Sequence, residues 1–280
     1  FWVEKLKKEA PRNWDIFYKT HSNHFFKDRN WTTQVFEVLK DKELDLSLDE
    51  KGEDLITKKV LLEVGCGVGN FIWPLLENSN VNKIYCFDFS PRAIEILKRH
   101  EKFDSNRIKP FVYDLTADDY DLDKTNQNLT QNLGSDFGSI DLISCIFVLS
   151  AIPPDKIQLA VKRLVSVLKP GGEIIIRDYA INDASQLRFH SKKSSSYSTH
   201  PSKLSKSLPF YRRSDSTLTY FFNIDEISNL FCESNNNDGD HDYIIKTLEC
   251  QIIKRSLINR KSQIDLDRHF IQARFKKLKK

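Results

Sequence analysis

Three features of this chain that could bind a ligand each follow a short apolar run. They are the glycines Gly65, Gly67 and Gly69, the carboxylate of Asp88 and the carboxylate of Asp114. Ligands of open α/β sheets bind outside the carboxyl ends of the strands. Glycine lets the backbone approach a ligand closely and adopt positive φ. We therefore expect a nucleotide-type site at one edge of a parallel sheet.

The order of these residues favours S-adenosyl-L-methionine over a dinucleotide. A dinucleotide site uses G-x-G-x-x-G with a phosphate at a helix N-terminus, whereas Glu63 here opens E-x-G-x-G-x-G with no basic residue near to balance a phosphate. Asp88 follows the glycines by about 20 residues, which suits an acceptor for both ribose hydroxyls. Asp114 can accept from an adenine amino group. Each acid alone could instead cap a turn, but the set predicts this cofactor and, as product, S-adenosyl-L-homocysteine.

Several other chemistries lack their signatures. No Asn-Pro-Pro-Tyr or Asp-Pro-Pro-Tyr follows the apolar run 140–147, and no Pro-Cys pair offers a cysteine nucleophile. The histidines show no metal-ligand spacing, so we expect no metal. The five cysteines are odd in number and form no C-x-x-C, which suits a reducing compartment, the cytoplasm. No run of about 18 apolar residues predicts a membrane span.

Strands alternating with helices must position these residues. Ser90 and Pro91 are typical of a helix N-cap and first turn, and the apolar run 140–147 is typical of a central parallel strand. The alternation predicts a doubly wound α/β sheet, with two late runs forming an antiparallel pair at its edge. We expect a turn at 169–172 and helices after the glycines and from residues 91, 153 and 225. The predicted strands are 59–64, 83–87, 109–113, 140–147, 173–177, 243–253 and 269–275.

The chain divides into an N-terminal segment, 1–50, and a larger domain, 51–280. The N-terminal segment is aromatic and basic and is predicted to be helical, with one helix ended by Pro11 and another over 34–40. Trp14 and Tyr18 lie four residues apart, hence on one helix face. From the residues alone, this segment either covers an apolar sheet edge or forms a lid that contacts ligand.

Charge is unevenly spread, although the net charge is only +4. The stretch 188–213, a predicted flexible insertion, holds seven Lys or Arg and no acid, and 246–280 holds eleven Lys or Arg and three acids. The stretch 114–141 instead holds seven Asp and one Lys. Such asymmetry indicates a polyanionic partner on one side. The alternative is a solvated surface without a partner.

The chain resembles the tRNA 3-methylcytidine methyltransferases, eukaryotic class I enzymes that use S-adenosylmethionine to modify cytidine in the anticodon loop. The resemblance runs from about residue 14 to residue 275. Its N-terminal aromatic motifs and Arg177-Asp-Tyr179 are more specific than the glycine turn. The matching motifs are Trp14-Asp-Ile-Phe-Tyr18, Phe25-Phe-Lys-Asp-Arg29, Glu63-x-Gly-Cys-Gly-Val-Gly-Asn70, Asp88-Phe-Ser-Pro-Arg-Ala93, Asp114-Leu-Thr116, Ile146-Phe-Val-Leu-Ser-Ala151, Leu168-Lys-Pro-Gly171, Arg177-Asp-Tyr179, Phe210-Tyr211, Tyr220-Phe-Phe222 and Asn259-Arg-Lys261.

The resemblance implies a Rossmann-like class I methyltransferase fold with a seven-stranded, mostly parallel sheet, an antiparallel last strand and an N-terminal helical lid. It also implies cofactor contacts. Trp14 and Tyr18 would close over the cofactor, and Gly65, with Gly67 in the same turn, would line its methionine side. Asp88 would hold the ribose, Asp114 and Leu115 would frame the adenine, and Ile146 would add a backbone contact.

The implied reaction forms 3-methylcytidine at position 32 of serine or threonine tRNAs. Cytosine N3 carries a free lone pair, so the enzyme mainly needs positioning and electrostatics, on a base turned out of its loop. We expect Asp178 to stabilise the positive charge that grows on the base and Arg177 to orient Asp178 or hold a phosphate; a structural ion pair is the alternative. The residues expected to bind tRNA are Lys27, Arg29, Arg188, Arg212, Arg213, Arg260 and Lys261.

Other readings stay open at this point. Ala180 replaces the Gly usual in the family, and Asp215-Ser-Thr-Leu218 replaces Asp-Gly-Thr-Arg, which puts tRNA contacts there in question. Another RNA could be the acceptor, or the chain could be a cofactor-binding scaffold that needs a catalytic partner. Some family members work with seryl-tRNA synthetase, so that enzyme joins tRNA among the expected partners of a monomeric protein.

Overall fold

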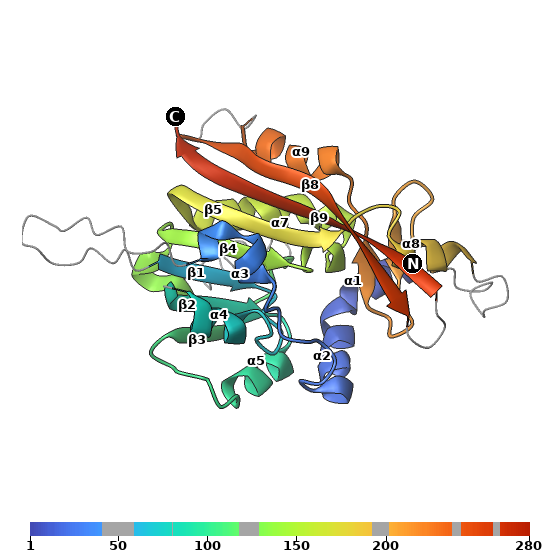
Figure 1. The fold of residues 1–280 in the computed structure, drawn as a ribbon, viewed down its shortest axis with the longest axis horizontal. Coiled ribbons are helices and arrows are strands. Elements are labelled where there is room, and N and C mark those ends of the chain that lie inside the picture. Colours follow the sequence, from blue (N-terminus) through green and yellow to red (C-terminus); the bar gives the residue numbers. More distant parts are fainter. Residues whose placement is uncertain (41–58, 80, 118–128, 192–201, 237–241, 260–263) are drawn as a thin grey trace, which may run out of the picture.

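A seven-stranded sheet built from the most apolar segments forms the centre of the molecule (Figure 1). The structure is a computed structural model that describes residues 1–40, 59–79, 81–117, 129–191, 202–236, 242–259 and 264–280. The strand order is β3-β2-β1-β4-β5-β9-β8. The strands are β1 (Lys59–Val64), β2 (Val81–Asp88), β3 (Ile108–Val112), β4 (Ile140–Ile146), β5 (Leu168–Tyr179), β8 (Tyr243–Asn259) and β9 (Ile264–Lys279).

The predicted sheet is confirmed, including its one change of direction. The pairs β1–β2, β1–β4, β2–β3 and β4–β5 are parallel, and β9 lies antiparallel between β5 and β8. The turn predicted at 169–172 is wrong, because β5 already begins at Leu168. Leu168 pairs with Ile140, and the register then shifts so that Glu173 pairs with Leu142. The residues between them form a bulge in the strand.

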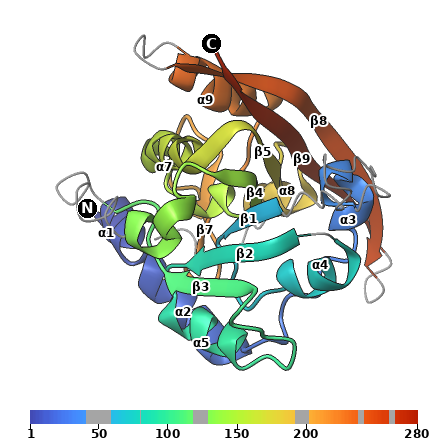
Figure 2. The ribbon, with the colours of Figure 1, turned by 90° about the vertical axis from the view of Figure 1, so that its left-hand side faces the viewer.

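Helices cover both faces of the sheet (Figure 2). α4 (Ile72–Asn78) and α5 (Pro91–Lys98) pack on one face, and α7 (Pro154–Val167) and α9 (Ile224–Asn236) pack on the other. Leu61 and Leu62 of β1 belong to opposite core clusters. This follows from the alternation of side chains along a strand.

The N-terminal segment forms α1 (Trp2–Lys8), α2 (Ala10–His21), α3 (Thr32–Val35) and a 3₁₀ turn, η1 (Glu37–Leu39). α1 ends at Lys8, so the predicted end of a basic helix near Pro11 is confirmed. Pro11 itself stands in the first turn of the next helix, α2, where a missing N–H costs nothing. The helix predicted over 34–40 is wrong in extent, since α3 stops at Val35. α1 and α2 lie on the side to which the arrowhead of β5 points (Figure 1).

The remaining elements stand beside β5. α8 (Ala184–Ser191) follows β5, and β6 (Phe210–Arg212) pairs with β7 (Leu218–Tyr220) in a small hairpin. Of the predicted flexible insertion 188–213, residues 192–201 lie outside the described residues, as does the predicted boundary at residue 50. The described part near Ser202 is ordered by pairing, because its carbonyl accepts from the Arg212 amide at 2.7 Å.

One buried arginine supports the loop that follows β3. Arg163 of α7 is 4% exposed. Its NH1 donates to the Leu115 carbonyl at 2.6 Å and its NH2 to the Ala117 carbonyl at 2.9 Å. Because α7 is fixed against the sheet, these bonds hold the loop at the carboxyl end of β3.

We expect Arg163→Met to lower the free energy of unfolding by about 2 kcal/mol, because the Leu115 carbonyl loses a charge-assisted hydrogen bond. Urea denaturation measures the change. The control is Lys98→Met, an exposed position on α5, where we expect a change within about 0.5 kcal/mol. Equal stabilities for the two variants would show that Arg163 does not support the loop.

Candidate functional site

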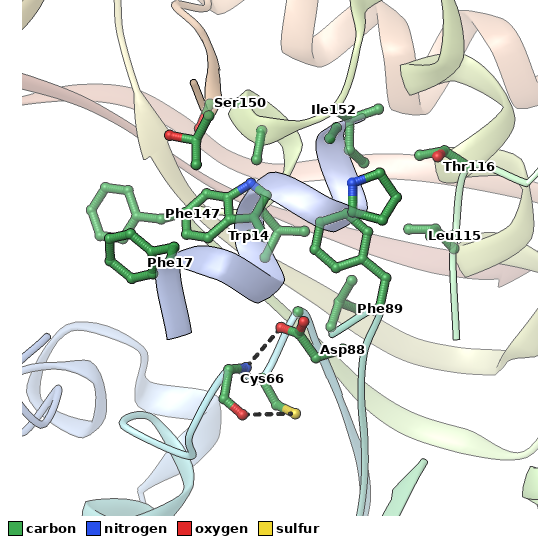
Figure 3. Close-up of a pocket in the computed structure, with 18 of the residues that line it drawn as sticks. Trp14, Phe17, Cys66, Asp88, Phe89, Leu115, Thr116, Phe147, Ser150 and Ile152 are labelled. Carbon is green, nitrogen blue, oxygen red and sulfur yellow. Dashed lines mark hydrogen bonds between the residues drawn. The ribbon is translucent and has the colours of Figure 1, made fainter. Parts of the chain in front are cut away.

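A cavity of about 810 Å³ opens at the carboxyl ends of the strands, beneath α2. Its wall includes residues from the ends of β1, β2, β3, β4 and β5 and from the N-terminal segment. Trp14 and Phe17 of α2 lie across the cavity from Cys66 and Asp88 (Figure 3). Ligand sites range over roughly 300–1,000 Å³, so this cavity has room for a nucleoside-sized cofactor and part of an acceptor.

The glycine turn lets other groups approach the backbone closely. Gly67 has φ +53°, and a Cβ built there would lie 2.6 Å from the Tyr18 hydroxyl. Gly69 has φ +94°, and its Cβ would lie 2.5 Å from the Trp73 ring. Any side chain at these positions would be strained and would clash. The glycine turn therefore forms the cavity floor and the surface on which α2 packs.

Asp88 joins the ends of β1 and β2. Its Oδ2 accepts from the Gly67 amide at 3.0 Å and its Oδ1 accepts from the Ser90 amide at 2.9 Å. The side chain lines the cavity, and burial raises its pKa to about 6 although both amides oppose the shift. A carboxylate offers about four acceptor positions, so two are left for a diol at this strand end.

Asp114 and Leu115 line the cavity at the end of β3. Asp114 Oδ1 accepts from the Thr116 amide and hydroxyl, each at 2.8 Å. The turn-capping alternative is therefore correct for this oxygen. Oδ2 takes no part in these two bonds, so capping and ligand contact are compatible. Leu115 supplies an apolar side chain beside the carboxylate, which suits a flat heterocycle.

Ile146 does not lie in the cavity wall. Its side chain is buried in the core cluster beneath α4, and its carbonyl accepts from Arg29 NH1 at 2.8 Å. The next two residues, Phe147 and Val148, line the cavity instead. An ideal Cβ on Gly65 would lie 2.8 Å from Val148, so this stretch abuts the glycine turn.

The N-terminal aromatic segment lies partly in the cavity wall and partly against the sheet. Trp14 and Tyr18 line the cavity, whereas Phe36 and Leu39 are buried against the sheet. The Trp14 Nε1 is buried with no hydrogen-bond partner among the residues that the structure describes. A buried indole N–H normally has a partner. A polar ligand atom in the cavity would supply one.

Hydrogen bonds and ion pairs anchor the N-terminal segment around the cavity. Asp15 accepts from the Ser90 hydroxyl at 2.7 Å, and Asn13 donates to the Ser216 carbonyl at 3.1 Å. Lys7 pairs with Asp155 at the start of α7, at 2.9 Å. Anchors on three separate elements hold α1 and α2 across the strand ends.

Asn70 fixes the stretch that follows α2. Its carbonyl accepts from the Arg29 amide at 2.8 Å. Its side-chain amide donates to the Phe26 carbonyl at 3.1 Å and to Asp28 at 3.0 Å. The residue that ends the glycine motif therefore also places Arg29.

Arg29, expected on the tRNA-binding surface, lies in the cavity wall beside Glu63. Burial lowers the pKa of its guanidinium, and Glu63 and Asp178 oppose that shift. Burial also raises the pKa of Glu63 well above its usual value, and Ser144 donates a hydrogen bond to it. Arg29 thus brings positive charge to the inside of the cavity.

Asp178 and Arg177, the expected catalytic residues, stand just outside the cavity wall. Asp178 is fully buried and accepts from the Ser150 amide at 2.9 Å and the Tyr179 amide at 2.8 Å. Burial raises its pKa to about 6, against a hydrogen bond from the Ser150 hydroxyl. Arg177 donates to Gln272 at 2.5 Å, with its guanidinium 4.9 Å from the Trp31 ring. They point to opposite faces of β5, so they do not form an ion pair.

The other residues expected to bind tRNA are spread over several elements. Lys27 and Arg213 line the cavity. Arg188 is exposed on α8, and Arg212 lies on β6 with its guanidinium 5.9 Å from the Trp2 ring. Arg260 and Lys261 lie outside the described residues. Of the residues expected to bind tRNA, Lys27, Arg29 and Arg213 thus come together at the cavity, whereas Arg188 and Arg212 do not line it.

Sequence reasoning missed the residues of the far cavity wall. Phe147 and Tyr179 line the cavity at the ends of β4 and β5, and Ser150 lies beside them. Phe147 is the last residue of the predicted strand 140–147, and Tyr179 lies two residues after the predicted strand 173–177. The rule that ligands bind at the carboxyl ends of parallel strands therefore points to both residues.

The residues that the structure describes contain no cluster of His, Cys, Asp or Glu able to hold a metal ion. Nor does any helix among them have the length and apolar character to cross a membrane. Cys66, Cys86 and Cys145 are buried free thiols.

Comparison with known proteins gives relatives that match nearly the whole of this chain. A family model described as a methyltransferase domain matches residues 62–174. The tRNA N(3)-cytidine methyltransferase METTL6 of Rattus norvegicus is 38% identical over 277 residues, covering 99% of this chain and 83% of that protein. The tRNA N(3)-methylcytidine methyltransferase trm141 of Schizosaccharomyces pombe is 39% identical over 278 residues, covering 99% and 96%.

Solved structures agree on the fold. A SAM-dependent methyltransferase from Anabaena variabilis aligns with a TM-score of 0.58 at 16% identity, covering 95% of this chain and 94% of that one. The 1,6-didemethyltoxoflavin N1-methyltransferase of Burkholderia thailandensis, solved with S-adenosylhomocysteine, aligns with a TM-score of 0.55 at 12% identity, covering 97% and 89%. The predicted Rossmann-like class I methyltransferase fold is confirmed. Because the rat and fission-yeast enzymes are 38% and 39% identical over nearly the whole of this chain, the chain belongs to the tRNA N(3)-cytidine methyltransferase family.

Proposed function

We propose that this protein transfers a methyl group from S-adenosyl-L-methionine to N3 of a tRNA cytidine. The observation that carries the proposal is the cavity at the strand ends, where Asp88, Asp114 and the glycine turn line one wall and the family's aromatic segment lines the other. Relatives named tRNA N(3)-cytidine methyltransferases match nearly the whole chain, which extends the proposal to the acceptor.

The order of the strands suggests how the cofactor would lie. Adenine would meet Asp114 and Leu115 at β3, the ribose would meet Asp88 at β2, and the methionine part would meet Gly65 and Gly67 at β1. These strands are neighbours in the sheet. Trp14 and Tyr18 would cover the cofactor from α2, and Ile146 would act only through the backbone next to Phe147. S-adenosylmethionine supplies an electrophilic methyl group on a sulfonium.

The acceptor chemistry needs little from a general base. Cytosine N3 has a lone pair and becomes cationic on methylation, so the site must position the base and tolerate growing positive charge. Asp178 does not line the cavity, but it accepts a hydrogen bond from Ser150, which does. It would therefore act as a positioning residue whose negative charge offsets the charge on the base. Arg177, on the opposite face of β5, would stabilise the strand end rather than touch the base.

The proposal also names the target nucleotide, the cellular compartment, the partner and the residues that bind tRNA. We propose cytidine 32 of the anticodon loop of serine or threonine tRNAs as target, in the cytoplasm, with seryl-tRNA synthetase as a partner of the monomeric enzyme. Residues 1–50 would form lid and tRNA contact, and 51–280 the methyltransferase domain with its basic insertion, 188–213. Lys27 and Arg213 at the cavity, Arg188 and Arg212 beside it, and Arg260 and Lys261 would hold the tRNA backbone.

The purified protein, given total tRNA and S-adenosylmethionine, is expected to form 3-methylcytidine, detected by nucleoside mass spectrometry. A different methylated nucleoside would overturn the proposal and indicate another RNA reaction. Product that forms only after seryl-tRNA synthetase is added would support a partner-dependent enzyme. Cofactor binding without product under either condition would favour the scaffold alternative.

Cofactor affinity should fall about tenfold from pH 7 to pH 5, because the ribose needs ionised Asp88 and its pKa is about 6. This folded-state pKa lies above the unfolded one, so ionisation of Asp88 lowers the free energy of unfolding as pH rises from about 4 to 6. Cofactor binding strengthens over the same interval. Titration calorimetry at several pH values measures the affinity.

Asp88→Asn should weaken cofactor binding about tenfold to hundredfold and remove most of this pH dependence, because an amide has a single acceptor oxygen. Asp104→Asn, at an exposed turn-capping carboxylate, serves as control and should bind like the wild type. Unchanged affinity in Asp88→Asn would exclude the ribose contact.

Asp178→Asn should reduce methyl transfer at least tenfold with cofactor affinity unchanged, because the neutral amide no longer offsets charge on the base. Turnover, cofactor calorimetry and thermal unfolding are measured together. A matched fall in all three would show that Asp178 acts as a structural cap for Ser150 and Tyr179. Wild-type turnover would exclude both a catalytic and a positioning role.

A further inference from the structure

Phe147 combines a strained backbone with a ring in the cavity wall. It follows β4 directly and has φ +60°, a region that bulky residues rarely occupy. Its amide donates to the Arg177 carbonyl at 2.7 Å, which ties the strained residue to β5. Such strain concentrates where a side chain must be aimed for function.

The ring is held from several sides by neighbouring groups. Tyr179 packs against it with ring centroids 5.1 Å apart, and Phe270 with centroids 5.6 Å apart in an edge-on arrangement. The Arg29 guanidinium lies 5.4 Å from its centroid. The residue is nevertheless only half-buried and lines the cavity. It is therefore a fixed aromatic surface facing the cavity.

Its place in the sheet puts this surface on the acceptor side. Under the proposed function, the cofactor extends from β3 through β2 to β1. The next strand along the sheet is β4. Val148 already abuts Gly65 of the glycine turn, so Phe147 stands next to the end of the cavity where the methionine part, and hence the methyl group, would lie.

We propose that Phe147 is the platform on which the acceptor cytosine stacks, and that it favours the cationic methylated base over the neutral one. This inference rests on the proposed function. The bond from N3 to the methyl carbon forms as the sulfonium–methyl bond breaks, so the positive charge passes from sulfur to the base. An aromatic face attracts a cation through its quadrupole, so Phe147 interacts more strongly as the charge arrives on the base.

Neighbouring charges are compatible with this role. Arg29 lies near the same ring, but its own charge faces Glu63 and Asp178 and its NH1 is bound to the Ile146 carbonyl. Tyr179 is a weaker candidate for the platform, because it ends β5, which lies one strand farther from β1 and its glycine turn than β4 does. We assign Tyr179 the support of Phe147.

The test compares Phe147→Leu, Phe147→Tyr and wild type on tRNA under single-turnover conditions. Leu keeps apolar bulk without a quadrupole, so we expect the methylation rate to fall about tenfold to hundredfold, the range that loss of one base–aromatic stack implies. Tyr should restore most of the rate. Cofactor affinity by calorimetry should stay within about twofold of wild type in both variants. The matched control is Phe103→Leu, a half-buried phenylalanine remote from the cavity, with a wild-type rate expected.

A further variant separates catalysis from folding. Phe147→Gly removes the ring but also relieves the positive φ, so we expect a melting temperature within a few degrees of wild type with a rate as low as that of Phe147→Leu. A wild-type rate in Phe147→Leu, or a parallel loss of cofactor affinity, would overturn the platform. If the wild-type protein itself forms no 3-methylcytidine, the proposed function fails instead. The wild-type sample in the same assay distinguishes that outcome from failure of the platform.

Discussion

The hydrogen bond from the Gly67 amide to the Asp88 carboxylate is the contact on which the site depends. It closes the glycine turn against the end of β2, and the turn in turn sets how near Tyr18 and Trp73 can come. α2 then rests on the turn through Tyr18 and on the start of α5 through Asp15 and Ser90. This bond, together with the one from the Cys66 amide to the Phe87 carbonyl, places the floor of the cavity and the segment that covers it.

Buried charge is the second constraint. Asp88, Asp178 and Glu63 all have raised pKa values because they are removed from water. The fold compensates them mainly with backbone N–H groups at strand ends and with the guanidinium groups of Arg29 and Arg213. Such an arrangement fixes dipoles before a ligand arrives, which is how enzymes favour a change of charge during reaction.

Much of the fold was predictable because strand and helix signals are local. β1 was predicted to the residue and α5 with its Ser90 cap, since an apolar run and a capping hydroxyl act over a few residues. The bulge in β5 and the start of α2 at Ala10 are not predicted by the local pattern. A Lys-Pro-Gly-Gly stretch favours a turn locally, but pairing with β4 on either side of it, at Leu168 and Glu173, keeps β5 continuous. Proline suits both the end of one helix and the first turn of the next.

The sequence by itself determined which chemistry the strand ends could carry, and its motifs indicated the family, because residue type and spacing limit what a nucleotide-type site can bind. Only the tertiary structure decided which of those residues line the cavity and which lie behind its wall. It moved Arg29 from the expected surface into the cavity, set Asp178 behind Ser150, and placed Phe147, with its positive φ, in the cavity wall. These outcomes depend on contacts between residues far apart in the chain, such as Arg29 with Ile146. The spacing of residues along a sequence does not determine which distant side chains contact one another or which of them line a cavity.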